Sequence, residues 1–145
     1  MDTALSYTLM AQDTCDLGNP ITIEFVIQNL SSREVWILKW YTPLEGIKGK
    51  IFEIKCDGVE MQYEGRFVKR GNPTKDDYVF LLPDLSVQVE VDLSQAYSLR
   101  KCKECQVTFK GRIHDVVFDE HQVPRASDQQ HPITIPGNTV SFQIV

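Results

Sequence analysis

The residues best suited to chemistry are two closely spaced cysteines, Cys102 and Cys105. Two intervening residues are typical of zinc ribbons and of thiol–disulfide active sites. A structural zinc site usually takes four ligands from two such pairs, and the sequence contains no second pair. A redox pair favours a helix N-terminus, which lowers the thiol pKa, whereas this pair begins a strand-like run. We therefore expect structural thiols or an incidental disulfide, with Cys56 and Cys105 packing as small buried hydrophobes.

The three histidines, His114, His121 and His131, do not form a metallopeptidase motif. That motif places two histidines four residues apart on one helical face, and Pro124 interrupts any helix around Glu120-His121. Ligation of a metal by His114 and His121 from a hairpin is a weaker alternative. The sequence also contains no Gly-x-Ser-x-Gly elbow and no Gly-rich phosphate loop. We expect no catalytic residues, no metal site and no cofactor.

Length and charge set the broad class. A chain of 145 residues with 42% hydrophobic and 24% charged residues is typical of one globular domain. Its net charge of −5 argues against nucleic acid or an anionic membrane as a partner, because both require a basic face. The N-terminal segment lacks the positive region of a secretory signal. We expect a cytoplasmic protein with free thiols, or a secreted one if the chain is a processed fragment; the oligomeric state stays open.

The apolar pattern predicts strands. Apolar and polar residues alternate over residues 21–28 and 87–93, an Asp57-Gly58 turn predicts a hairpin, and no stretch repeats every 3.6 residues. Val35 to Tyr41 predicts a strand with Trp36, Leu38 and Trp40 on one face. Tyr97 is placed to cap a sheet corner. We predict an all-β fold: one antiparallel two-sheet β-sandwich of the immunoglobulin-like or Greek-key type, with about eight strands in residues 1–145.

Two loops, 42–49 and 64–77, interrupt these strands. The segment from Arg66 to Gly71 is the one local concentration of positive charge in an acidic chain. It is either a solvated loop that pairs with Asp76 and Asp77, or a contact loop that meets an acidic cleft on a partner.

Several blocks in the chain resemble one known module. They are Leu38-Lys39-Trp40-Tyr41-Thr42-Pro43-Leu44-Glu45-Gly46, Tyr63-Glu64-Gly65-Arg66, Lys69-Arg70-Gly71-x-Pro73, Asp77-Tyr78-Val79 and Val91-Asp92-Leu93-Ser94-x-Ala96-Tyr97. Together they resemble the N-terminal pro-domain of deuterolysin-type (aspzincin, peptidyl-lysine) zinc metallopeptidases, over about residues 20–120. In that family the module precedes the peptidase domain and is thought to keep it latent and help it fold.

The sequence departs from the family pattern in two ways. It contains no peptidase domain, zinc motif or signal peptide, and it has Cys102 to Cys105 where the family's penultimate strand tends to begin with a glycine and a tyrosine. The resemblance therefore implies a non-enzymatic binding module, an inhibitor or latency-type partner of a deuterolysin-like metallopeptidase. The alternative is a structural or adhesion-like β-sandwich that binds another protein or a glycan through exposed aromatic residues.

The candidate partner-binding residues come from the two loops. They are Thr42, Pro43, Leu44, Glu45, Lys48, Arg66, Lys69 and Arg70. We expect Lys69 or Arg70 to enter an acidic specificity pocket, which a lysine-directed peptidase must carry, with Lys48 as the next candidate.

Overall fold

The computed structural model describes residues 4–110 and 112–145, and in this part of the chain every regular element is a strand or a single 3₁₀ turn. The strands are β1 (Leu5–Met10), β2 (Thr14–Cys15), β3 (Thr22–Asn29), β4 (Val35–Leu38), β5 (Phe52–Cys56), β6 (Val59–Glu60), β7 (Tyr78–Leu81), β8 (Ser86–Asp92), β9 (Cys102–Phe109), β10 (Arg112–Ile113), β11 (Val116–Val117), β12 (Ile133–Thr134) and β13 (Thr139–Ile144). The 3₁₀ turns are η1 (Pro43–Glu45), η2 (Lys75–Asp77), η3 (Leu93–Gln95), η4 (Glu120–Gln122) and η5 (Ser127–Gln129). No helix in the described residues is long and apolar enough to cross a membrane.

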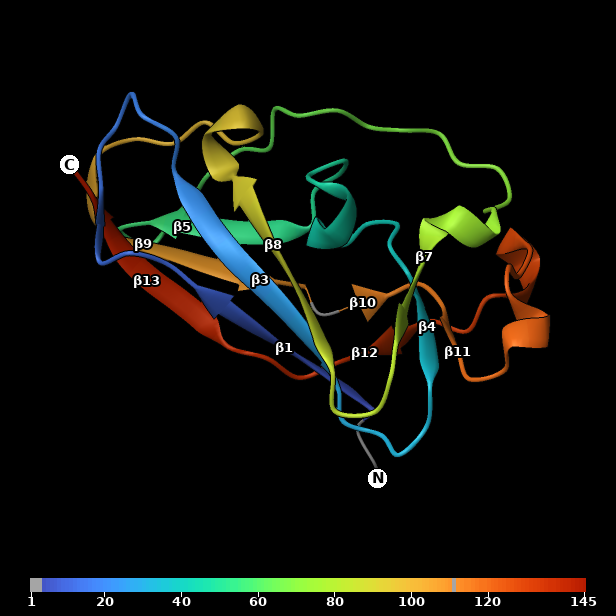
Figure 1. The fold of residues 1–145 in the computed structure, drawn as a ribbon. Helices are drawn as coiled ribbons and strands as arrows, with labels where there is room; N and C mark the ends of the chain where they lie inside the picture. The colour runs from blue at the N-terminus through green and yellow to red at the C-terminus, as the bar shows by residue number, and fades with distance from the viewer. Residues whose placement is uncertain (1–3, 111) are drawn as a thin grey trace.

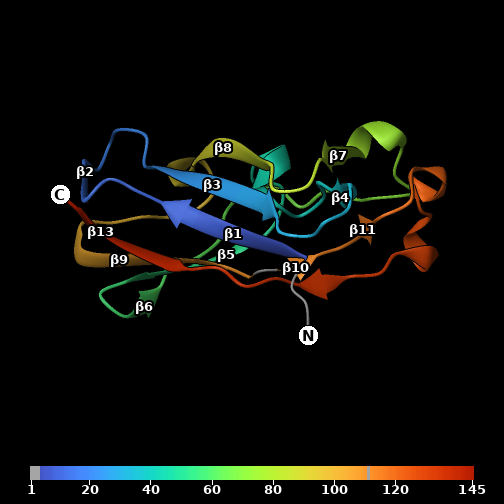
Figure 2. The same cartoon turned by 60° about the horizontal axis from the view of Figure 1, so that its bottom comes forward.

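The strands form four sheets, two of which make the body of the molecule. One has the order β1-β3-β8 and the other β2-β13-β9-β5-β6, and Figure 2 shows them as two layers. A smaller sheet, β11-β4-β7, lies at one end, and β10 pairs with β12 (Figure 1). All pairings are antiparallel except β2 with β13, which run parallel.

The main core fills the space between the two layers. In β3 buried and half-buried positions alternate strictly, because successive side chains of a strand point to opposite faces. Tyr7 and Phe25 from the first layer meet Phe109 of the second with ring centroids 5.1 and 5.3 Å away. The Tyr7 hydroxyl also donates to the Phe109 carbonyl at 3.1 Å. The arrangement is therefore β-sandwich-like.

Strand β4 is buried on both faces. Val35 and Ile37 belong to the main core. Trp36 and Leu38 belong to a second, smaller cluster with Trp40, Tyr78 and Val117. Val35 and Ile37 therefore join the β11-β4-β7 sheet to the body, while the smaller cluster lies on the other face of that sheet and buries both tryptophans at 7% exposure. The prediction that Trp36, Leu38 and Trp40 lie on one side is confirmed.

The all-β prediction is confirmed, but the architecture differs from one antiparallel two-sheet sandwich of about eight strands. The described residues form thirteen strands in four sheets. Five of these strands have only two residues, too short for a period-two pattern to reveal them. The predicted strand 35–41 ends at Leu38, because Tyr41 has a φ of 58° and turns the chain out of the sheet.

Tyr97 caps a corner between the sheets, as the sequence predicts. Its side chain is buried, and its hydroxyl accepts the Phe52 N–H at 3.1 Å and donates to the Phe52 carbonyl at 2.9 Å. Tyr63 forms a β-bridge with Tyr97 and is followed by the long loop 64–77. The corner therefore fixes where that loop leaves the body.

Candidate binding surface

The first loop begins with a turn at the end of β4 that the sequence specifies locally. The Thr42 hydroxyl donates to the Lys39 carbonyl at 2.8 Å and accepts the Leu44 N–H at 3.1 Å, so it caps η1. Pro43 occupies the first position of η1, where no N–H is needed, and Gly46 closes the turn with a φ of 85°. Thr42 and Pro43 are buried, so their role in this structure is to shape the loop.

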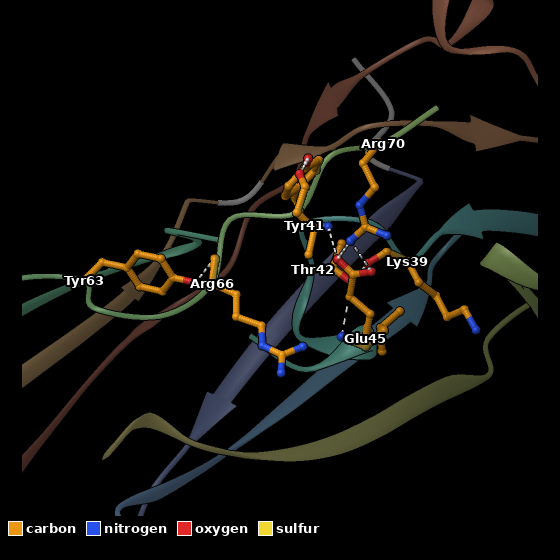
Figure 3. Close-up of polar contacts among 9 residues, drawn as sticks. Lys39, Tyr41, Thr42, Glu45, Tyr63, Arg66 and Arg70 are labelled. Carbon is orange, nitrogen blue, oxygen red and sulfur yellow. Dashed lines mark hydrogen bonds and ion pairs between the residues drawn. The ribbon is translucent and has the colours of Figure 1, made fainter. Parts of the chain in front are cut away.

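Glu45 and Arg70 join the two loops across 25 positions of sequence (Figure 3). One guanidinium nitrogen, Nη2 of Arg70, lies 2.7 Å from both carboxylate oxygens of Glu45. The Glu45 carboxylate also accepts the Tyr41 N–H at 2.7 Å, and the Arg70 guanidinium lies over the rings of Trp40 and Tyr41 at 4.8 and 5.2 Å. The side chains of Glu45 and Arg70 are only 8% and 19% exposed. The pair is therefore a mostly buried clasp, which we call the Glu45–Arg70 clasp.

The second loop has no regular structure between Tyr63 and η2, yet it is attached along its length. The Tyr63 hydroxyl donates to the Arg66 carbonyl, and the Tyr41 hydroxyl lies 3.5 Å from the Val68 carbonyl. Beyond the Glu45–Arg70 clasp, the Ser127 hydroxyl donates to the Gly71 carbonyl at 2.6 Å. Figure 1 shows this segment running along one side of the molecule to η2. The loop is therefore preorganised by side-chain contacts.

The eight residues predicted from sequence to meet a partner divide into three groups. Lys48, Arg66 and Lys69 are exposed; Leu44, Glu45 and Arg70 are half-buried; Thr42 and Pro43 are buried. Arg70 is held within the chain by Glu45, and this is not the pairing with Asp76 or Asp77 weighed from the sequence. Of the two cations expected to enter an acidic pocket, Lys69 is the one that faces solvent.

Sequence reasoning left out Phe67, the most exposed of the large apolar side chains in the described residues at 79%. Its ring meets the edge of Tyr63 at 5.2 Å. Beside it lies a hollow of about 310 Å³, the Phe67 hollow, lined by Tyr41, Gly49, Lys50, Ile51, Phe67, Phe109, Lys110, Arg112 and His114. The floor is apolar, and Lys50, Lys110 and Arg112 are exposed cations at its rim. The hollow combines residues from three separate segments, which no local pattern could indicate.

His114 lines the same hollow and lies against Tyr41, with ring centroids 4.9 Å apart. Burial lowers the pKa of His114 from its ordinary value, and the nearby charge of Arg112 lowers it further, while Glu45 opposes both. The lowered pKa favours the neutral imidazole, so the cations beside the hollow are Lys50, Lys110 and Arg112, of which Lys50 also pairs with Glu60 at 3.1 Å.

Arg66 borders a different and acidic surface. A groove of about 650 Å³ runs between the two loops and β8, lined by Thr22, Gly46, Ile47, Glu64, Gly65, Arg66, Glu90, Val91, Asp92, Gln95 and Ala96. Three carboxylates line it, although Asp92 is engaged by the Ile21 N–H and by Ser94. The groove beside β8 is therefore mainly acidic, whereas the rim of the Phe67 hollow is basic.

A buried carboxylate anchors the end of the molecule that carries the second loop. Asp115 is fully buried and accepts the Tyr78 hydroxyl at 2.6 Å and the His131 N–H at 3.0 Å, with Arg125 at 3.7 Å. Burial, followed by the hydrogen bond to Asp115, raises the pKa of Tyr78 well above its ordinary value. These contacts hold residues 119–132 against the smaller cluster, where Ser127 in turn holds the second loop.

The aromatic surface required by the glycan-binding alternative is largely buried. Trp36, Trp40 and Tyr63 are at most 9% exposed, and Tyr41 is half-buried beneath Arg70. The exposed candidate surface therefore consists of the two loops and the Phe67 hollow.

Comparison with known proteins gives limited similarity. No protein-family model matches the chain. A stretch of 79 residues, 54% of the chain, is 28% identical to a protein named extracellular protease from Aeromonas hydrophila, and it spans 22% of that protein's length. Among solved structures, the CARDB domain of a Pyrococcus furiosus protein aligns with 98% of this chain and 94% of its own, at 10% identity and a TM-score of 0.37. The chain is thus weakly similar to part of an extracellular protease.

Proposed function

We propose that this protein is a non-enzymatic binding module that inhibits a zinc metallopeptidase of the deuterolysin kind or keeps it latent. The observation that carries the proposal is the Glu45–Arg70 clasp, which fixes two long loops in place and leaves Lys69 and Phe67 outside. A loop that is already ordered loses little conformational entropy on binding, so more of its contact energy becomes affinity.

Each exposed residue has a distinct role in this proposal. Lys69 enters the acidic specificity pocket of the peptidase as a point charge. Phe67 is the apolar anchor, since aromatic side chains are enriched among residues that dominate interface energies. Lys50, Lys110 and Arg112 at the rim of the Phe67 hollow face acidic residues around the cleft and increase the association rate.

Two further points support the proposal. The blocks that resemble the deuterolysin-type pro-domain fall partly in both loops, and 79 residues of the chain are 28% identical to a part of an extracellular protease that makes up 22% of its length. If the protein acts beside such a protease, it acts outside the cell.

The experiment is an inhibition titration of a purified deuterolysin-type peptidase with a lysine-containing peptide substrate. We expect the protein to reduce the rate, and Lys69→Ala to weaken inhibition about 30-fold, the size expected for a hot spot of about 2 kcal/mol. Phe67→Ala should weaken inhibition to a similar degree, and neither substitution should change the unfolding midpoint, because both side chains are exposed.

Lys103→Ala is the matched control, since Lys103 is also an exposed lysine but lies in β9, next to the Asp57-Gly58 turn. It should inhibit like the unaltered protein. Peptidase activity that stays unchanged at micromolar concentrations of the protein would reject the proposal. Equal losses for Lys69→Ala and Lys103→Ala would reject the assignment of Lys69.

A further inference from the structure

Cys102 and Cys105 of β9 converge in the second layer with Cys56 of β5, which is distant from them in the sequence. The Sγ atoms of Cys56, Cys102 and Cys105 all lie within 4.8 Å of one another. Cys56 in β5 and Cys105 in β9 are direct cross-strand partners, and both are fully buried. Cys102 is 7% exposed, at the start of β9. A single buried cysteine usually packs as a small hydrophobe, but three thiols in mutual contact form a soft donor set.

A β-bulge produces this convergence. Cys102 and Cys105 are three positions apart, so a regular strand would place them on opposite faces. Their partners in β13, Ile144 and Phe142, are only two positions apart, so β9 contains one extra residue between the two cysteines. The bulge turns Cys102 toward the face that carries Cys105, and bulges commonly redirect a side chain in this way.

Asp57 holds the bulge in place. Its Oδ1 accepts the N–H groups of Lys103 and Glu104 at 3.1 and 3.0 Å, and its own N–H donates to the Glu104 carbonyl at 2.9 Å. Asp57 follows Cys56 directly, with a φ of 48° in the β5–β6 turn. One residue therefore orients cysteines from both strands. Because its carboxylate already accepts these N–H groups, Asp57 is a positioning residue and not a fourth ligand.

We propose that Cys56, Cys102 and Cys105 form a three-coordinate thiolate site for a soft monovalent metal ion, Cu(I). A metal–thiolate bond of about 2.3 Å places three sulfurs in a plane about 4.0 Å apart, so the observed spacing needs shifts of less than about 1 Å. Structural zinc takes four ligands, and the grouping among the described residues offers three. Thiolates are the ligands that select Cu(I), and three of them suit it without a fourth.

Charge and access are consistent with this ion. Three thiolates and one Cu(I) carry a net charge of −2, and Arg100, Lys101 and Lys103 supply three cations within three positions of Cys102. Binding releases three thiol protons to solvent and involves no change in oxidation state. Cys102 provides the route of entry, since the other two sulfurs are fully buried.

The test is an anaerobic titration of the reduced protein with Cu(I) against a chromophoric Cu(I) chelator. We expect one equivalent to bind, and X-ray absorption of the complex to show three sulfur neighbours. Cys102→Ser should lower the affinity by about 100-fold or more, since even changes outside the ligand set typically cost 10–100-fold. Asp57→Asn should weaken binding less, by loosening the bulge.

Cys15→Ser is the matched control, because Cys15 lies outside the grouping of three sulfurs. It should bind Cu(I) like the unaltered protein. X-ray absorption of the Cu(I) complex of the unaltered protein gives the number of sulfur ligands even if a cysteine variant does not fold. The proposal is rejected if the protein cannot compete with the chelator, if Cys102→Ser binds equally well, or if two of the three sulfurs form a disulfide in the protein as isolated.

Discussion

Removing either partner of the Glu45–Arg70 clasp should destabilise the protein strongly, because the remaining charge is left unpaired in a mostly buried site. Glu45→Gln keeps an oxygen for the Tyr41 N–H but removes the charge, and Arg70→Met keeps an apolar stem over Trp40. Removing one partner of a fully buried ion pair costs about 3–5 kcal/mol. With side chains 8% and 19% exposed, we expect each single substitution to lower the free energy of unfolding by about 2–4 kcal/mol.

The assay is urea denaturation of the two single variants and the double variant. A loss of about 2–4 kcal/mol corresponds to about 6–12 °C in melting temperature for a domain of this size. The double variant should lose less than the sum of the singles, because the first substitution already leaves the second charge unpaired. We expect a coupling energy of about 2 kcal/mol.

The exposed ion pair between Lys75 and Glu120 is the internal comparison. Its atoms lie 3.4 Å apart, but its side chains are 60% and 61% exposed, so the same cycle there should give about 0–1 kcal/mol. If the coupling between Glu45 and Arg70 falls in that lower range, the clasp does not hold the loops. The two loops would then not form a preorganised binding surface.

Three other changes have definite expected results. Tyr97→Phe should lower the free energy of unfolding by about 1–3 kcal/mol in urea denaturation, because both backbone groups of Phe52 lose their buried partner. Asp115→Asn should speed hydrogen exchange at the His131 amide and cost about 1–3 kcal/mol, since an amide offers one acceptor oxygen where the carboxylate offers two. The free energy of unfolding should fall as the pH is lowered through about 6.5, because His114 then binds a proton more readily in the unfolded chain than in the folded protein. His114→Gln should make the free energy of unfolding depend less on pH, as measured by urea midpoints at several pH values.

The sequence predicts the elements whose information is local. Alternation gives β3 and β8, the Asp57-Gly58 turn gives the β5–β6 hairpin, and Tyr97 is recognisable as a corner tyrosine. The parallel pairing of β2 with β13 joins opposite ends of the chain, at Cys15 and Ile144, so no local pattern contains it. The division into four sheets depends on strands of two residues, which are too short to show an alternation of apolar and polar residues.

The same limit explains the candidate site and the cysteine grouping. The sequence shows the pair Cys102 and Cys105 but not the bulge that aligns them or the strand pairing that adds Cys56. It shows the basic segment from Arg66 to Gly71 but not the partner of Arg70, which lies 25 positions earlier. Long-range pairs of this kind are specified by the packing of the whole fold.

Lys69 and Arg70 show why the charge of a side chain does not by itself identify a binding residue. In an extended segment successive side chains point to opposite sides. Val68 and Arg70 are half-buried and Lys69 between them is exposed, so the backbone sorts two adjacent cations into different roles. Substituting both, as the sequence alone would suggest, removes a structural ion pair together with a candidate contact residue. Lys69→Ala alone should change binding without changing stability, Arg70→Met should change stability first, and a protein in which both substitutions acted alike would show that the loop is not held as the structure describes.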